Sequence, residues 1–170
     1  MSTNQNTRQG QPIFLCDAML GTLARWLRFF GLDTIYPQPG MEDRELAAIA
    51  EEGGRWLLTR DGELAARGPR TLLVRSADLD GQLVEVLGRL DLRPEVNLDR
   101  ARCSECNGSL TEVTRAEVES TIPPHVAATA PRFRRCEGCG RVYWPGSHGD
   151  RILSRMAAVL ARLGDGTGNP

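Results

Sequence analysis

The stretch Ile13-Phe14-Leu15-Cys16-Asp17 is a short apolar run that ends in an acid, and the chain repeats this pattern twice. The other two runs are Trp56-Leu57-Leu58-Thr59-Arg60-Asp61 and Leu72-Leu73-Val74-Arg75-Ser76-Ala77-Asp78. Segments with helical periodicity separate them. Alternating strands and helices predict one parallel sheet, with the carboxyl end of every strand on the same edge. We therefore expect an α/β fold in which acids far apart in sequence converge on one crevice.

The segments between these runs have the spacing and end residues of helices. Leu20, Leu23, Leu27 and Phe30 are three or four residues apart and define one helical face, which Gly31 ends. A short strand is expected over 33–36, and helices over 42–52, over 62–67 and after Asp78. The predicted alternation of strand and helix gives a parallel sheet covered by helices.

Four aspartates stand where a strand gives way to a helix: Asp17, Asp43, Asp61 and Asp78. Converging carboxylates repel one another unless a cation holds them, and Mg²⁺ or Mn²⁺ is the ordinary ion for oxygen ligands. Metal ions held in this way support in-line attack on a phosphodiester, so we predict a metal-dependent nuclease. Each aspartate could instead cap a helix N-terminus, and the two roles can coexist.

Composition and charge limit the other possibilities. The 170 residues, 41% of them hydrophobic, are enough for one domain with a core or for one domain plus a small appendage. No apolar run approaches the ~20 residues that span a bilayer, so we expect no membrane partner and a cytoplasmic location. All 21 basic residues are arginine, which excludes any mechanism that needs a lysine. This argues against a receiver-type phosphotransfer domain.

Two C-x-x-C pairs define a second unit: Cys103 with Cys106, and Cys136 with Cys139. Four thiolates from two tight turns suit tetrahedral Zn²⁺, and disulfides are the alternative in an oxidising compartment. The 29 residues between the pairs exceed the usual ~15–20, so we expect an inserted loop or helix between residues 116 and 130. Cys16, alone on an apolar strand, is expected to be an inert core residue.

Arginines and aromatic residues alternate around the second cysteine pair. Arg134, Arg135 and Trp144 belong to this group, and arginine with aromatics suits single-stranded RNA through phosphate contacts and base stacking. The aromatics could instead form the ribbon's own core. His148 could contact phosphate, transfer a proton or tie a turn. Arg25 and Arg28 share a helical face beside Asp17, where they could contact phosphate or face solvent.

With both units in view, the chain resembles the Mut-seven C-terminal RNase family, a PIN-like domain fused to a zinc ribbon. The resemblance covers about residues 13–152. It is carried by both cysteine pairs and by three stretches: DAMLGTLARWLR from Asp17 to Arg28, LLTRD from Leu57 to Asp61, and VYWPGSH from Val142 to His148.

The resemblance implies a PIN-type three-layer α/β/α fold and a Mg²⁺- or Mn²⁺-dependent ribonuclease. Asp17, Asp43 and Asp61 match the metal-binding acids of the family. PIN nucleases usually hold a fourth acid, for which Asp78 is the best candidate, with Asp80, Glu42 and Glu45 as alternatives. Arg25, Arg28 and Arg60 would neutralise phosphates, and the ribbon would hold RNA that is single-stranded, tRNA or rRNA.

The expected organisation is a disordered lead over 1–11, a nuclease domain over 12–95, a ribbon over 100–152 whose final helix continues to about 163, and a flexible tail over 164–170. The alternative function is a zinc-ribbon adaptor for RNA or protein whose PIN-like site is vestigial. Whether activity needs a protein or ribosomal partner is left open by the residues.

Overall fold

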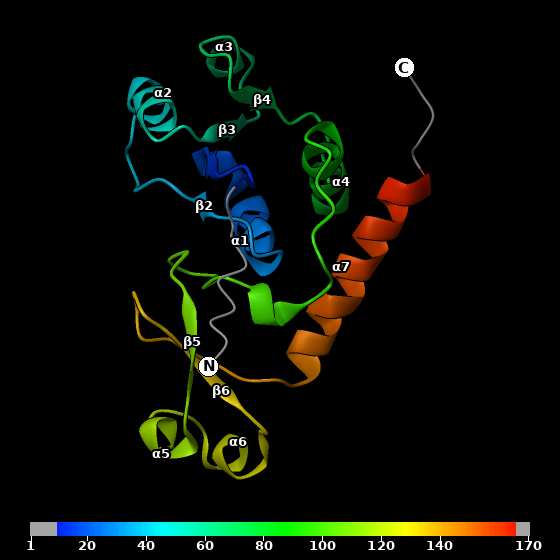
Figure 1. Ribbon diagram of the computed structural model, residues 1–170. Helices are drawn as coiled ribbons and strands as arrows, with labels where there is room; N and C mark the ends of the chain where they lie inside the picture. The colour runs from blue at the N-terminus through cyan, green and yellow to red at the C-terminus, as the bar shows by residue number, and fades with distance from the viewer. Residues whose placement is uncertain (1–9, 166–170) are drawn as a thin grey trace.

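The computed structural model describes residues 10–165 of the chain. The expected lead over 1–11 and tail over 164–170 lie almost wholly outside these residues. Figure 1 shows a larger unit built around a parallel sheet, a smaller unit built around β5 and β6, and a long C-terminal helix that runs alongside the larger unit.

The larger unit is a four-stranded parallel sheet in the order β2-β1-β3-β4. Phe14 pairs with Thr34 on one side and with Trp56 on the other, which places β1 in the middle of the sheet. The predicted parallel sheet is therefore confirmed. Its strands are β1 (Phe14–Cys16), β2 (Thr34–Ile35), β3 (Trp56–Thr59) and β4 (Thr71–Leu73).

Helices cover both faces of this sheet, which confirms the three-layer α/β/α arrangement (Figure 1). Side chains alternate along β1: Phe14 and Cys16 pack in one core, and Leu15 packs in the other. The first core includes α1 and α4, and the second includes α2 and α3. These helices are α1 (Gly21–Phe29), α2 (Asp43–Glu52), α3 (Gly62–Ala65) and α4 (Leu79–Arg89), with the 3₁₀ turn η1 (Ala18–Leu20) before α1.

The smaller unit is an antiparallel sheet in the order β5-β6-β7. Two short helices fill the segment between the cysteine pairs, where an insertion was expected, and Val118, Val126 and Phe133 pack into a small core of its own. Its elements are η2 (Leu98–Arg100), β5 (Leu110–Val113), α5 (Arg115–Val118), α6 (Pro124–Thr129), β6 (Phe133–Cys136) and β7 (Val142–Tyr143).

The last helix, α7 (Ser147–Asp165), follows the ribbon in sequence but packs on the larger unit. Its apolar stripe is Ile152, Met156, Val159 and Leu163, which is buried in the same core as α1 and α4. The first strand, β1, and the last helix, α7, therefore share one core, and the ribbon is inserted between α4 and α7. No helix among residues 10–165 is long and apolar enough to cross a membrane.

A polar network joins the ribbon to the edge strand β2. The Asp33 carboxylate accepts hydrogen bonds from Arg55 at 2.6 Å and from Asn107 at 3.0 Å, and it pairs with Arg102 at 3.3 Å. Asn107 Oδ1 in turn accepts from the Thr34 N–H at 3.0 Å. Partial burial raises the pKa of Asp33, but the hydrogen bonds from Arg55 and Asn107 and the Arg102 charge outweigh it and lower the pKa.

Candidate functional site

Asp17 lies at the carboxyl end of β1, at the point where the strand order reverses. The chain leaves β1 for β2 on one side and returns to β3 on the other, and α/β sheets bind ligands at such a point. Asp17 is only 5% exposed. Its Oδ1 accepts from the Met19 N–H at 2.8 Å, and its Oδ2 accepts from the Arg60 N–H at 3.1 Å.

Thr59, at the end of β3, connects the acids of the two central strands. Its hydroxyl donates to Asp17 Oδ2 at 2.5 Å and accepts from the Asp61 N–H at 2.9 Å. Thr59 is fully buried, so its geometry is fixed by the sheet. No sequence pattern marks Thr59 as part of a site, although it stands inside the stretch Leu57–Asp61, because a threonine on an apolar strand is usually only a strand former.

Asp61 is exposed and caps α3, since its Oδ1 accepts from the Glu63 N–H at 2.7 Å and the Leu64 N–H at 3.0 Å. The capping role considered from the sequence is therefore real at this residue. Both capping bonds fall on Oδ1. The other oxygen, Oδ2, has room for a further partner at the same sheet edge.

Asp43 and Asp78 follow the outer strands β2 and β4. Asp43 is the exposed first residue of α2, whose N-terminus is closed by a capping box between Glu42 and Glu45. Asp78 caps α4, and the bond from the Gly81 N–H, 2.9 Å long, holds its pKa below the ordinary value. Within residues 10–165 no three carboxylates meet as closely as a preformed metal site requires.

Two exposed hydrophobic side chains that were not predicted as site residues flank Asp17. Met19, 70% exposed, belongs to η1, and Tyr36, 42% exposed, follows β2. The Tyr36 hydroxyl donates to the Ala18 carbonyl at 2.7 Å, which fixes the ring beside this turn. No local sequence pattern marks an exposed tyrosine as part of a site, because its neighbour Ala18 is 18 residues away.

The three arginines predicted to bind phosphate near Asp17 have different environments. Arg60 is exposed and follows β3 directly. Arg25 is exposed and pairs with Glu105 at 3.3 Å. Arg28 is 5% exposed, and its guanidinium donates to the carbonyls of Thr34, Ser104 and Glu105. Burial lowers the pKa of Arg28. The sequence placed Arg28 on an accessible helix face, but the ribbon covers that face.

The four predicted zinc ligands meet in one cluster, with all four Sγ atoms within 4.8 Å of one another. The Sγ atoms of Cys106 and Cys136 are 3.3 Å apart, and those of Cys103 and Cys139 are 3.6 Å apart. Sulfurs bound to one tetrahedral Zn²⁺ at 2.3 Å are about 3.8 Å apart, so the cluster fits that ion. All four cysteines are free, which argues against the disulfide alternative.

Local structure favours the thiolate at Cys103 and sets the close spacing of the sulfurs. Burial raises the pKa of Cys103, but hydrogen bonds from the Tyr143 hydroxyl and from the N–H groups of Cys106 and Glu105 outweigh it and lower the pKa to about 6. A side chain at Gly108 would place its Cβ 2.8 Å from the Cys136 sulfur, so glycine is required there. By contrast, burial raises the pKa of Cys16, which agrees with an inert core thiol.

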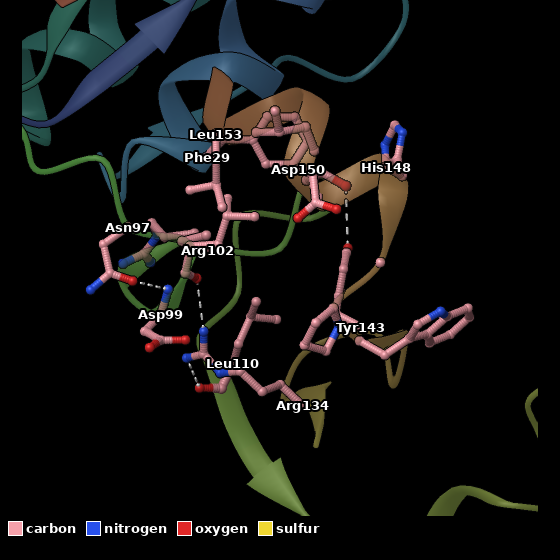
Figure 2. Close-up of a pocket in the computed structure, with 18 of the residues that line it drawn as sticks. Phe29, Asn97, Asp99, Arg102, Leu110, Arg134, Tyr143, His148, Asp150 and Leu153 are labelled. Carbon is pink, nitrogen blue, oxygen red and sulfur yellow. Dashed lines mark hydrogen bonds between the residues drawn. The ribbon is translucent and has the colours of Figure 1, made fainter. Parts of the chain in front are cut away.

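Three of the four predicted RNA-binding residues of the ribbon lie at its junction with α7. Arg134, Trp144 and His148 line a cavity of about 700 Å³ there, and Figure 2 shows Arg134 and His148 on its wall. The Arg134 guanidinium donates to the Leu98 carbonyl at 3.1 Å and the Leu110 carbonyl at 2.7 Å. Arg135 lies outside the cavity lining and donates to the Glu117 carbonyl.

The chain matches the model of the Mut7-C RNAse domain over residues 12–156, which spans both the parallel sheet and the ribbon. This chain belongs to the Mut7-C RNase domain family. The match confirms the resemblance drawn from the motifs, and membership of an RNase family implies a nuclease that acts on RNA. Among curated proteins and solved structures, none matches the Mut7-C chain significantly.

Proposed function

We propose that this protein is a Mg²⁺- or Mn²⁺-dependent ribonuclease that hydrolyses RNA phosphodiesters at the carboxyl edge of its parallel sheet. One observation carries the proposal: the hydrogen-bonded chain from Asp17 through Thr59 to Asp61 at the strand-order reversal. A buried carboxylate is costly unless it is paired, and three donors compensate Asp17.

The carboxylates of Asp17, Asp43 and Asp61 would hold the divalent cation, although they do not form a tight cluster before it binds. An ionised carboxylate can accept about four hydrogen bonds. Asp17 accepts one at Oδ1 and two at Oδ2, so one acceptor position is left at Oδ1. Asp61 retains Oδ2, and Asp43 is exposed at the same edge on the β2 side. A cation bound by these oxygens supplies Lewis-acid activation of the phosphodiester.

The protein's own residues then have distinct roles. Asp17 is a rigid ligand because β1, β3 and η1 all hold it, and Thr59 orients it. Asp43 and Asp61 are exposed ligands that can adjust to the ion. Asp78 is the weakest candidate of the four, since it follows the outer strand β4, two strand spacings or roughly 10 Å from β1. Arg60 is placed to neutralise a phosphate beside Asp17.

The ribbon has a structural and an RNA-holding role in this proposal. The four cysteines hold a structural Zn²⁺, and Cys103 to Asn107 dock against β2 and α1 through Arg28 and the Asp33 network. Arg28 therefore positions the first cysteine turn and does not contact RNA in this proposal. The nuclease unit over 12–95 and the ribbon over 100–152 act as one body, because α7 follows the ribbon and packs in the core of the nuclease unit.

A cleavage assay tests the proposal. Zinc-loaded protein is incubated with a mixed, end-labelled RNA pool and Mn²⁺, beside the double variant Asp17→Asn, Asp61→Asn. We expect fragments from wild type alone, and their lengths separate endonucleolytic from exonucleolytic action. Equal cleavage by the double variant would place the chemistry elsewhere or assign it to a contaminant.

The alternative is a zinc-ribbon adaptor with a vestigial site. One observation favours it: in the described part of the chain the carboxylates do not already form a tight cluster, whereas the cysteines do. Titration with Mn²⁺ separates the two functions. A nuclease binds Mn²⁺ in wild type and loses that binding in Asp17→Asn, whereas an adaptor shows no carboxylate-dependent binding.

A further inference from the structure

The cavity at the ribbon junction has no part in the proposed cleavage site. Its volume is about 700 Å³, within the range of small-molecule sites, and its walls come from α1, the segment around η2, the ribbon and the start of α7. In Figure 2, Phe29 and Leu153 lie on one side, Leu110, Arg134 and Tyr143 lie on the other, and His148 and Asp150 stand at the start of α7.

The charge of the cavity favours an anion. Five arginines line it against three acidic residues. Two of the lining arginines have ion pairs on the surface: Arg132 pairs with Asp99 at 2.6 Å and Arg141 with Glu105 at 3.9 Å, and both arginine side chains are about half exposed. Exposed pairs of this kind stabilise a protein little, so these arginines can exchange a carboxylate for a phosphate at small cost. Arg102 is instead held in the partly buried Asp33 network.

The cavity also presents an apolar surface for a flat ligand. Among residues 10–165, large hydrophobic side chains are exposed at Met19, Tyr36, Val96 and Trp144. Met19 and Tyr36 flank Asp17, and the other two line this cavity. An exposed tryptophan beside arginines is suited to stacking a base while the phosphate is held.

We propose that this cavity binds one unpaired nucleotide of single-stranded RNA, with its base on Trp144 and its phosphate on the exposed arginines. The proposal deepens the proposed function and rests on it. Bases in a duplex are stacked inside the helix, so only an unpaired nucleotide can enter the cavity.

The position of the cavity relative to Asp17 sets the kind of substrate. Helix α1 starts beside Asp17 and ends at Phe29, in the cavity wall. Its nine residues span about 14 Å at 1.5 Å per residue. The nucleotide held in the cavity is therefore not the one that is cut at Asp17, and the two are separated along the RNA strand. The substrate is a single strand several nucleotides long, anchored away from the cut.

The test measures RNA binding on full-length, zinc-loaded protein that carries Asp17→Asn, so that the RNA stays intact. A fluorescent decameric oligouridine is the probe, and anisotropy gives the Kd. We expect Trp144→Ala to raise the Kd about 5- to 150-fold, the range for loss of one stacked base. Trp144→Phe keeps an aromatic surface and should restore most of the affinity. Zinc content and thermal melting show that each variant is folded.

A second pair of variants tests the phosphate contacts. Arg141→Gln removes a charge from the cavity, and Arg115→Gln removes one from the exposed surface of α5, outside the cavity. We expect Arg141→Gln to reduce the slope of log K against log salt by about 1, with no change for Arg115→Gln. The same oligonucleotide in a duplex should bind without dependence on Trp144.

Two results would overturn the inference. One is a Kd that is unchanged in folded Trp144→Ala and Arg141→Gln, and the other is an equal effect of Trp144→Ala on duplex and single strand. Its failure is separable from failure of the nuclease proposal. If wild type cleaves RNA and Trp144 has no effect on binding, the nuclease proposal stands and the subsite proposal fails. If binding depends on Trp144 but wild type does not cleave RNA, the subsite proposal stands and the nuclease proposal fails.

Discussion

The Thr59 hydroxyl stands between the acids of the two central strands and makes a bond to each residue. It donates to the Asp17 carboxylate and accepts from the backbone N–H of Asp61. Because Thr59 is fully buried, water cannot replace either bond. Thr59 therefore holds the Asp17 carboxylate and the backbone of Asp61, although it is not itself a proposed metal ligand.

Thr59→Val should impair cleavage while the protein remains folded. Valine has nearly the same shape but leaves the Asp17 oxygen and the Asp61 N–H without this partner, at a cost of about 1–3 kcal/mol in the free energy of unfolding. We expect single-turnover cleavage to slow at least tenfold. Thr34→Val is the matched control: Thr34 is equally buried and its hydroxyl donates to the Leu32 carbonyl rather than to Asp17. Equal cleavage by the two variants would argue against the role of Thr59.

Asp33→Asn should destabilise the protein in a pH-dependent way. The network of Arg55, Asn107 and Arg102 lowers the pKa of Asp33, so its contribution to stability is present above the unfolded value of about 3.9 and is lost as the pH falls below it. We expect the variant to lose about 1–3 kcal/mol at pH 7. Denaturant unfolding at pH 7 and pH 3 checks this. A wild-type advantage that grows toward pH 3 would contradict it.

At the scale of elements, the strands and the sheet edge follow from local patterns. Trp56–Thr59 forms the strand expected from its apolar run, and the acids follow the strands as predicted. Arg28 shows where this reasoning fails. It lies outside the apolar stripe of α1, yet it is buried, because Ser104 and Glu105 cover it from 76 and 77 residues away. Contacts at that separation leave no periodic signal in the sequence.

The first cysteine turn depends on a glycine for close approach of the sulfurs. A Cβ at Gly108 would meet the Cys136 sulfur at 2.8 Å and the Cys106 sulfur at 3.3 Å. Gly108→Ala should therefore displace at least one ligand and weaken zinc binding, measured by competition with a chromophoric chelator. Gly164→Ala, where a Cβ meets nothing within 4 Å, is the control. Unchanged zinc affinity in Gly108→Ala would show that the cluster tolerates wider spacing.

At the scale of the whole molecule, the ribbon and the nuclease unit are linked on two sides. The first cysteine turn is bonded to β2 and α1, and α7 returns to the core of the larger unit. The apolar spacing of α7 is visible in the sequence, but the surface that it covers is not, because helix periodicity identifies a buried face without naming its partner.

Zinc removal should therefore weaken the larger unit as well as the ribbon. A ligand at a thousandfold excess over its Kd stabilises a protein by about 4 kcal/mol, so we expect the Tm to fall by about 10 °C on chelation. Hydrogen exchange should accelerate at β2 and at the end of α1, next to the cysteine turn, more than at β3 and β4. Faster exchange confined to residues 100–146 would show that the two units are independent.

The central claim is that RNA is cut at the carboxyl edge of the parallel sheet, where Asp17 is held. The most direct measurement is the single-turnover rate of cleavage of a single-stranded RNA in Mn²⁺ by wild type, Asp17→Asn and Asp78→Asn. We predict that Asp17→Asn loses at least a hundredfold, the range for removal of an essential catalytic group. Asp78→Asn should stay within a few-fold of wild type. A wild-type rate in Asp17→Asn, or an equal loss in both variants, would contradict the account.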